Sequence, residues 1–244
     1  MSGFGHPTFH YHASAHALSG EFVRPIAKSI EAQAGASLPL AGGHGQASVG
    51  EFHLDKRLSF QGAYSRVSGS KGTDKKHHSE SASVVEGLNI LDVVTADRVV
   101  ARLSSEHDPG DPEGHILALG SRFENLRISG CPVRVQLNHD LLRKNQLYTE
   151  LSKELAGAKK SGKMAQESRG VIVCSLAKNV EIDCPGIEVD GHVITVPQFG
   201  KIYVAEMIAE FGKRTLTMLR LELGSPDSGL VSIVQADING RPWP

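Results

Sequence analysis

The feature that most constrains the fold of this chain is its repeated use of short apolar strands separated by glycine turns. The clearest example runs from Lys201 to Leu223, where two apolar segments flank the linker Phe211-Gly212-Lys213-Arg214. The apolar residues of these two segments are Ile202, Val204, Met207 and Ile208, and then Leu216, Met218, Leu219, Leu221 and Leu223. Two such segments joined by a short linker with glycine are typical of a β-hairpin.

Similar segments extend over most of the 244 residues. Residues Ala82 to Leu103 are rich in β-branched side chains, which favour strand over helix. The dipeptide Asp190-Gly191 lies between two further apolar segments, a strong short-range signal for a hairpin. We therefore predict a mainly β protein, an antiparallel β-sandwich or meander, in which residues 1–244 form a single domain.

One segment has helical rather than strand periodicity. Leu147, Leu151 and Leu155 are four residues apart and share one face of a helix. The sequence predicts one inserted amphipathic helix over about residues 139–157, with Asn138 or Asp140 as its cap. The polar stretch that follows, up to residue 170, predicts a flexible loop, so that the whole insertion covers about residues 138–170.

The overall charge of the chain argues against a nucleic-acid partner. The formal net charge is −1, whereas a nucleic-acid-binding protein needs a basic surface to displace counterions. The basic cluster of Lys71, Lys75, Lys76, His77 and His78 is local, and its flanking Gly, Ser and Thr residues favour a solvated loop. No run of about 20 apolar residues is present, so we expect no membrane-spanning helix.

The cysteines and the N-terminal sequence suggest a compartment. Cys131, Cys174 and Cys184 lack the spacing of a metal site, and they are expected to be reduced thiols. A bond between Cys174 and Cys184 across a strand pair is the alternative. The sequence from Met1 to His6 has no signal-peptide pattern, so we expect a cytoplasmic protein, with non-classical export left open.

Histidine is the residue type that is unusually frequent, with twelve in the chain. His10, His12 and His16 have the same parity, so on a continuous strand they project from one face. Imidazoles on alternate residues can bind Zn, Cu or Ni, which makes these three residues the predicted divalent-metal ligands. His16 is four residues beyond His12, about 13 Å along an extended strand, so a polar outer face or a subunit contact is the alternative.

Other groups of polar residues give weaker indications. Asp108, Asp111 and Glu113 lie in a loop rich in Pro and Gly and could bind Ca²⁺, but their spacing lacks the expected alternating ligands and favours a solvated acidic loop. His115 lies beside a turn glycine and needs no special role. Neither a nucleophile elbow nor a phosphate-binding loop is present, so the sequence identifies no catalytic residue and no organic cofactor.

Three segments support a resemblance to a known group of proteins. They extend from Val85 to Val99, from Pro197 to Glu206 and from Leu216 to Leu221. In these segments the chain resembles the uncharacterised "choice-of-anchor" type β domains of exported bacterial proteins. The resemblance implies a bacterial β domain, and it implies no catalytic or binding residue.

The sequence leaves two functional hypotheses and favours a non-enzymatic role. The first is a structural β-domain protein that self-associates into a homo-oligomer or a filament-like assembly, because the net charge is low and no catalytic set is present. The second is a β-sandwich module that binds a metal or a small molecule on the His10/His12 face. A carbohydrate-binding sandwich is disfavoured, because the chain has one Trp and sugar platforms rely on stacked aromatic rings.

Overall fold

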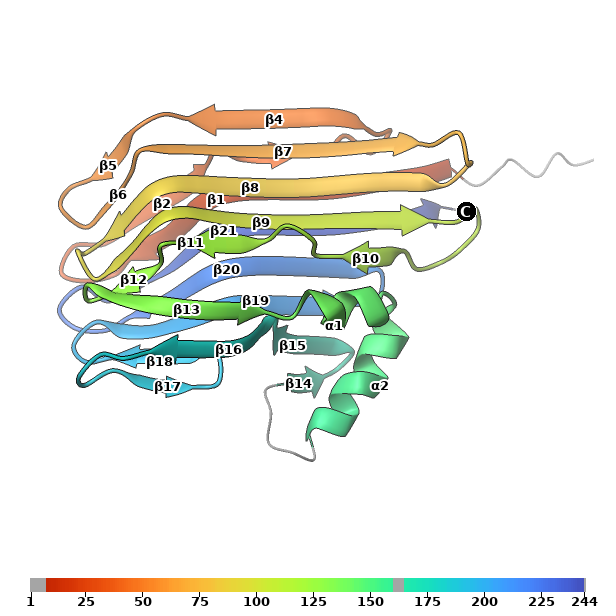
Figure 1. The fold of residues 1–244 in the computed structure, drawn as a ribbon. Helices are drawn as coiled ribbons and strands as arrows, with labels where there is room; N and C mark the ends of the chain where they lie inside the picture. Colours follow the sequence, from red (N-terminus) through yellow and green to blue (C-terminus); the bar gives the residue numbers. More distant parts are fainter. Residues whose placement is uncertain (1–7, 160–164, 244) are drawn as a thin grey trace, which may run out of the picture.

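The computed structural model describes residues 8–159 and 165–243, which form two packed antiparallel sheets. Figure 1 shows the sheets as two layers, with the helices at one end. Strand β1 packs across the layers against β8, and β21 packs against β9. The predicted mainly β, antiparallel and sandwich-like fold is therefore confirmed.

The first sheet has ten strands in the order β14-β15-β19-β20-β21-β1-β2, with β18 and β17 extending from β19, and β3 paired with β1. Its strands are β1 (Thr8–Phe22), β2 (Lys28–Gln33), β3 (Ala36–Ser37), β14 (Ala165–Ser168), β15 (Val171–Ser175), β17 (Glu188–Asp190), β18 (Val193–Val196), β19 (Gly200–Glu210), β20 (Lys213–Leu223) and β21 (Gly229–Trp243). The predicted hairpins at 201–223 and around Asp190-Gly191 are confirmed as β19–β20 and β17–β18.

The second sheet has eleven strands in the order β16-β13-β12-β9-β8-β6-β5, with β10 and β11 paired to β9, and β7 paired to both β8 and β4. Its strands are β4 (Gly43–Val49), β5 (Phe52–Leu54), β6 (Leu58–Phe60), β7 (Gly62–Lys71), β8 (His77–Ile90), β9 (Val94–His107), β10 (His115–Leu117), β11 (Arg122–Glu124), β12 (Arg127–Ile128), β13 (Cys131–Leu137) and β16 (Ala177–Ile182). The segment 82–103 thus forms the long β8–β9 hairpin.

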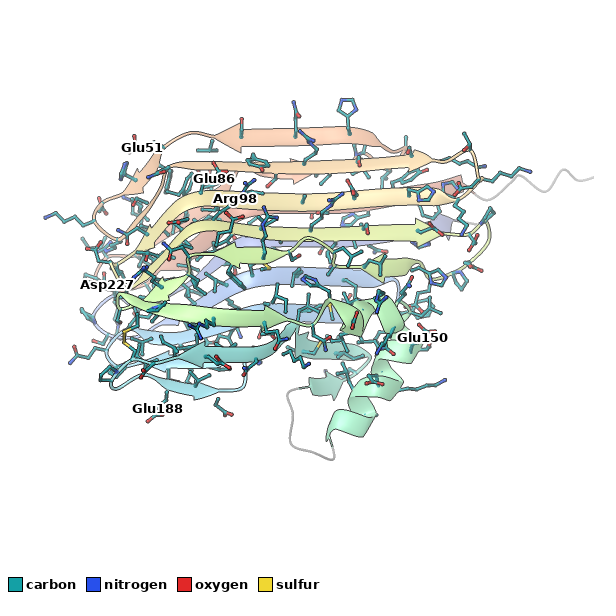
Figure 2. All side chains as sticks on the ribbon, in the orientation of Figure 1. Glu51, Glu86, Arg98, Glu150, Glu188 and Asp227 are labelled. Atoms are coloured by element: carbon teal, nitrogen blue, oxygen red, sulfur yellow. A yellow bond between two sulfur atoms is a disulfide. The ribbon has the colours of Figure 1, made fainter. Side chains whose placement is uncertain are left out.

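Alternation places apolar side chains between the sheets and polar ones outside, which is the origin of the core. On the outer face, Figure 2 shows Glu86 and Arg98 side by side, and their charged groups lie 3.5 Å apart. An exposed pair of this kind stabilises the fold by about 1 kcal/mol or less. Most of the stability must therefore come from the apolar layer, in which Leu103, Ile202 and Leu219 are fully buried.

The alternation changes phase at one row of the first sheet. The ladders of β1, β21, β20 and β19 are each interrupted at one position, between paired neighbours. The residues at these positions are Ala17, Val234, Met218 and Ala205, and each has 0% exposure. Ala205 and Val234 adopt positive φ angles of 50° and 56°. On β19, even-numbered residues point inward before this row and odd-numbered residues after it. Consequently Ile208, which belongs to the predicted apolar segment, is 39% exposed.

The helical insertion is two helices rather than the predicted single helix over 139–157. They are α1 (His139–Lys144) and α2 (Tyr148–Lys159). The side chain of Asn145 donates to the carbonyl of Leu141 and ends α1, while the Glu150 carboxylate accepts from the amide of Leu147 and starts α2. Local capping therefore interrupts the periodicity.

The predicted flexible loop after the helix is also partly wrong. Residues 165–168 form β14, which pairs with β15, because its backbone groups find partners at the edge of the first sheet. The rest of that prediction, residues 160–164, lies outside the described residues. No helix among the described residues is long and apolar enough to cross a membrane.

The prediction of three reduced thiols is wrong, and so is the alternative pair Cys174–Cys184. Cys131 and Cys184 form a disulfide with a Cα–Cα distance of 5.9 Å, whereas Cys174 is a buried free thiol. The reason is the pairing of β13 with β16, in which Val133 lies opposite Ile182. Extending that register by two residues on each strand places Cys131 opposite Cys184.

Candidate metal centre

The connection between β9 and β10 brings polar side chains together at one end of the sandwich. It opens with Asp108-Pro109-Gly110-Asp111, in which the amide of Asp111 donates to the carbonyl of Asp108 at 3.1 Å. Pro at the second position and a glycine with φ of 90° at the third are the pattern of a type II turn. The two aspartates are therefore held at the first and last positions of a tight turn.

The return strand adds a histidine to this pair. His115 begins β10 and lies opposite Glu106 of β9 in the antiparallel ladder. One ligand atom each from Asp108, Asp111 and His115 lies within 4.8 Å of the others. Within residues 8–159 and 165–243, no other group of three His, Cys, Asp or Glu side chains meets this criterion.

Two carboxylates and one imidazole form a mixed oxygen and nitrogen ligand set. Ca²⁺ prefers six to eight oxygen ligands, whereas imidazole nitrogen suits first-row cations such as Zn²⁺ and Mn²⁺ with fewer ligands. Three protein ligands leave coordination positions open for water or a bound molecule. The geometry therefore fits a divalent first-row cation with accessible positions better than a closed structural Ca²⁺ site.

A groove of about 360 Å³ opens beside this cluster and shares His115 with it. Such a volume lies in the range of small-molecule sites. The groove crosses β7, β8 and β9, with β10 at its side, and its lining residues are Ser68, Ser70, His78, Ser79, Glu80, Ser104, Ser105, Glu106, His115, Leu117 and Gln146. Five of these eleven residues are serines, so the groove offers hydrogen-bonding groups beside apolar atoms.

A lysine partly neutralises the acidic groups at the mouth of the groove. Lys76 Nζ lies 2.5 Å from a Glu106 carboxylate oxygen and 3.4 Å from Asp108 Oδ1. The hydrogen bond to Glu106 raises the pKa of Lys76. Because its ammonium group lies beside Asp108, Lys76 would compete with a cation bound to that carboxylate.

The loop that carries Asp108, Asp111 and His115 is anchored in the core by Glu113. Its side chain is 7% exposed, accepts a hydrogen bond from the amide of Tyr148, and lies 3.6 Å from the guanidinium of Arg214. Arg214 has 0% exposure, and burial lowers its pKa. Glu113 therefore points inward between the outward-facing Asp111 and His115. The predicted Ca²⁺ set of Asp108, Asp111 and Glu113 is thus replaced by a set that contains His115.

His107 lies directly under the same loop. It is 1% exposed, and both ring nitrogens are buried with no hydrogen-bond partner among the described residues. A Cβ atom at Gly114 would lie only 2.0 Å from its Nε2, so glycine is required there for close packing. Burial, with smaller contributions from His77 and His115, lowers the pKa of His107 to about 4. This imidazole is neutral at pH 7.

The structure places the predicted ligands His10, His12 and His16 on the outer face of β1, between the buried residues of the opposite face. It does not bring all three together. His12 Nε2 lies 3.5 Å from Asp237 of the neighbouring β21, whereas His16 Nε2 lies 2.8 Å from the hydroxyl of Ser19. Metal binding by the His10/His12 face stays a prediction.

The Lys/His cluster, which we expected to be a solvated loop, is divided by the fold. Lys75 lies in the turn, whereas His77 and His78 belong to β8. His77 stacks on Phe9 with ring centroids 4.0 Å apart, and its Nδ1 lies 2.7 Å from the hydroxyl of Tyr11. His77 is therefore part of the packing between the sheets, while His78 faces the groove.

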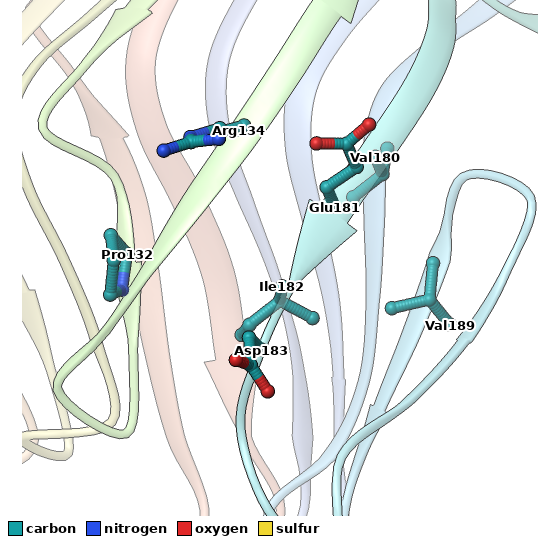
Figure 3. A pocket seen from close by; sticks show the side chains of 7 residues that line it. All are labelled: Pro132, Arg134, Val180, Glu181, Ile182, Asp183 and Val189. Atoms are coloured by element: carbon teal, nitrogen blue, oxygen red, sulfur yellow. The ribbon is translucent and has the colours of Figure 1, made fainter.

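A second groove, of about 470 Å³, lies along β16 near the disulfide. Figure 3 shows its charged side chains, Arg134, Glu181 and Asp183, spread along the wall rather than directed at one point. Val180, Ile182 and Val189 supply apolar atoms. Because no polar groups converge there, this groove is a weaker candidate for a specific site than the Asp108–His115 cluster.

His115 is not among the ligands predicted from the sequence, because no loop residue taken separately indicates a metal site. The spacing of Asp108, Asp111 and His115 in the sequence does indicate that they can meet. A Pro-Gly turn places Asp108 and Asp111 near each other, and a hairpin return places a residue four positions later beside the same turn. What could not be known is that Glu113 turns inward, because its partner Arg214 is distant in the sequence.

Fold and site together define an antiparallel β-sandwich of two sheets, with a candidate metal-binding cluster of Asp108, Asp111 and His115 at one end. The chain belongs to the family described as a domain of unknown function (DUF8256), whose sequence profile matches residues 9–161 and 148–210. No curated protein and no solved structure matches the chain. The resemblance to "choice-of-anchor" domains stays a prediction.

Proposed function

We propose that this protein is a non-enzymatic binding module in which Asp108, Asp111 and His115 hold a divalent first-row cation. The observation that carries the proposal is the convergence of their three ligand atoms within 4.8 Å, beside a groove that is lined in part by His115. The cation would present its open positions to a polar ligand lying in that groove.

The surroundings support a neutral polar ligand rather than an anion. Glu80 accepts from Arg102, and Glu106 accepts from Lys76, so the acidic groups at the groove are balanced by basic ones. The two aspartates would balance a divalent cation in the same way. Hydroxyl groups of Ser68, Ser70 and Ser104 are available in addition, and they pair with neutral donors and acceptors.

Removal of one ligand tests the site directly. After treatment with a chelator, the protein is expected to bind one equivalent of Zn²⁺ or Mn²⁺ in isothermal titration calorimetry, more tightly than Ca²⁺. Asp111→Asn and His115→Gln are each expected to weaken binding by about tenfold or more, because the loss of ligands from a three-ligand set is not compensated.

The matched control is Asp190→Asn, which changes an exposed aspartate on β17. It should leave the affinity for the cation unchanged. Binding that persists in both site variants, or the failure of the wild-type protein to bind any of the three cations, would contradict the proposal.

Lys76 gives a test in the opposite direction. Lys76→Met removes an ammonium group that lies 3.4 Å from Asp108 Oδ1. We expect the affinity for the cation to increase by about fivefold, because the substitution removes a positive charge that repels the cation and pairs with Asp108. The same titration measures it, and an unchanged or weaker affinity would show that Lys76 does not compete with the cation for Asp108.

The disulfide bears on the compartment. Disulfides persist in oxidising environments, so the Cys131–Cys184 bond supports export over the cytoplasmic location predicted from the sequence. Titration of free thiols in protein taken directly from cells would distinguish the two, with one reactive thiol after denaturation expected for the oxidised form.

A further inference from the structure

Strand β4 (Gly43–Val49) is an exposed edge without the usual protection against pairing. It pairs with β7 on one side, and Figure 1 shows it as the outermost strand at the top of the second sheet. Among the described residues, no backbone hydrogen bond from another segment reaches it. Its other edge therefore presents unpaired amide and carbonyl groups, which are a template for another strand.

The other long edges of the molecule are protected. Natural edge strands avoid association through charged side chains, proline, short length or a covering element. Strand β2 contains Lys28 and Glu31, β16 contains Lys178 and Glu181, and β14 packs against α2. Strand β4, with the sequence Gly-His-Gly-Gln-Ala-Ser-Val, has seven residues and contains neither Lys, Arg, Asp, Glu nor Pro.

The sequence of β4 is also compatible with itself. If two copies pair antiparallel about Gln46, then Gln46 faces its own counterpart, His44 faces Ser48, and Gly43 faces Val49. None of these cross-strand pairs opposes like charges, which would be destabilising. The two central glutamine amides can donate to and accept from each other. A two-fold axis perpendicular to the sheet gives this arrangement and keeps both outer faces on the same side.

We propose that the protein forms a homodimer in which the β4 strands of two copies pair antiparallel, centred on Gln46, and join the two second sheets into one. The occupant of this edge is a second copy of the same chain, because the edge is self-complementary. The interface of one strand pair is small, so a weak and reversible dimer is expected. The charged residues on β2 and β16 disfavour extension into a filament.

The test is a charge swap at Gln46, whose side chain is exposed. Analytical ultracentrifugation from micromolar to millimolar concentration is expected to show a reversible monomer–dimer equilibrium for the wild type. Gln46→Lys places two ammonium groups opposite each other and beside Arg66, which is the partner of Gln46 on β7. The dissociation constant of the dimer is expected to increase by about tenfold or more.

Mixing Gln46→Lys with Gln46→Glu restores complementarity, so a heterodimer is expected at least as tight as the wild-type dimer. Ser29→Lys adds the same charge to the exposed surface of the other edge, β2, and is expected to leave the equilibrium unchanged. A circular dichroism melt of each variant confirms that it is folded. Three results would overturn the proposal: a wild-type monomer at every concentration, a dimer indifferent to Gln46→Lys, or a mixture that does not associate.

Discussion

Glu113→Gln is expected to lower the free energy of unfolding by about 3–5 kcal/mol, because it leaves the buried guanidinium of Arg214 without its counter-charge. Glutamine keeps the shape of the side chain and the carbonyl oxygen that can accept from Tyr148. The substitution therefore removes mainly the negative charge that lies 3.6 Å from the guanidinium of Arg214. Chemical denaturation, followed by tryptophan fluorescence and circular dichroism, measures the change.

A double-mutant cycle separates the pair from the rest of the loop. Arg214→Met alone also destabilises the fold, since Arg214 donates to the carbonyl oxygens of Glu210 and Lys213. Once the arginine has been removed, however, the second change at Glu113 should cost little. We expect the double variant to be about 2 kcal/mol more stable than Glu113→Gln alone.

The control for this cycle is Glu188→Gln, because Glu188 projects outward from β17 (Figure 2) and should change stability by about 0.5 kcal/mol or less. Additive effects of the two substitutions at Glu113 and Arg214 would show that these residues are not coupled.

The Glu113→Gln variant also tests whether this buried pair supports the candidate metal site. If Glu113 positions the loop, the variant should weaken cation binding at conditions where it is still folded.

Lowering the pH from 7 to 5 is expected to destabilise the protein by about 2 kcal/mol through His107 alone. The pKa of this histidine falls from 6.5 to about 4 in the folded protein. The unfolded chain therefore takes up the proton first. Stability that is fully present above pH 6.5 is lost as the pH falls toward 4, and this residue causes no further loss below that value. Burial also lowers the pKa of the neighbouring His77, which acts in the same direction.

His107→Phe tests the origin of this pH dependence. Because both ring nitrogens lack hydrogen-bond partners among the described residues, the substitution sacrifices no bond there. Thermal or chemical unfolding at pH 5, 6 and 7 should show a smaller loss of stability on acidification in this variant. His53→Gln, at an exposed position on β5, should retain the wild-type profile. An unchanged slope in His107→Phe would assign the acid sensitivity to other groups.

The strands were predictable because their signal is local. Apolar alternation and the glycine turns indicated the β19–β20 and β17–β18 hairpins, and both are present. The helix prediction found the correct segment but missed the break, because Asn145 and Glu150 act through side-chain bonds to the backbone that periodicity does not include.

The contacts between distant segments were not predictable. The disulfide depends on the pairing of β13 with β16, and sequence distance alone favours the wrong partner, because Cys174 is much nearer to Cys184 than Cys131 is. The site depends on Glu113 turning inward to Arg214, which is far away along the chain. In each case the decisive partner comes from an element whose position is set by the packing of the sheets.

By itself, the sequence determined that the chain forms antiparallel β-sheets, because side-chain period and turn chemistry act between near neighbours. The tertiary structure alone decided which residues meet. The row of Ala17, Val234, Met218 and Ala205 reverses the inward phase on four adjacent strands, and the alignment of the four reversals depends on how these strands pair. Likewise, Asp108, Asp111 and His115 become one cluster because a buried charge pair holds their loop against the core. Burial and strand pairing between distant segments exist only in the assembled sheets. They decide which of the residues on each strand and loop come into contact.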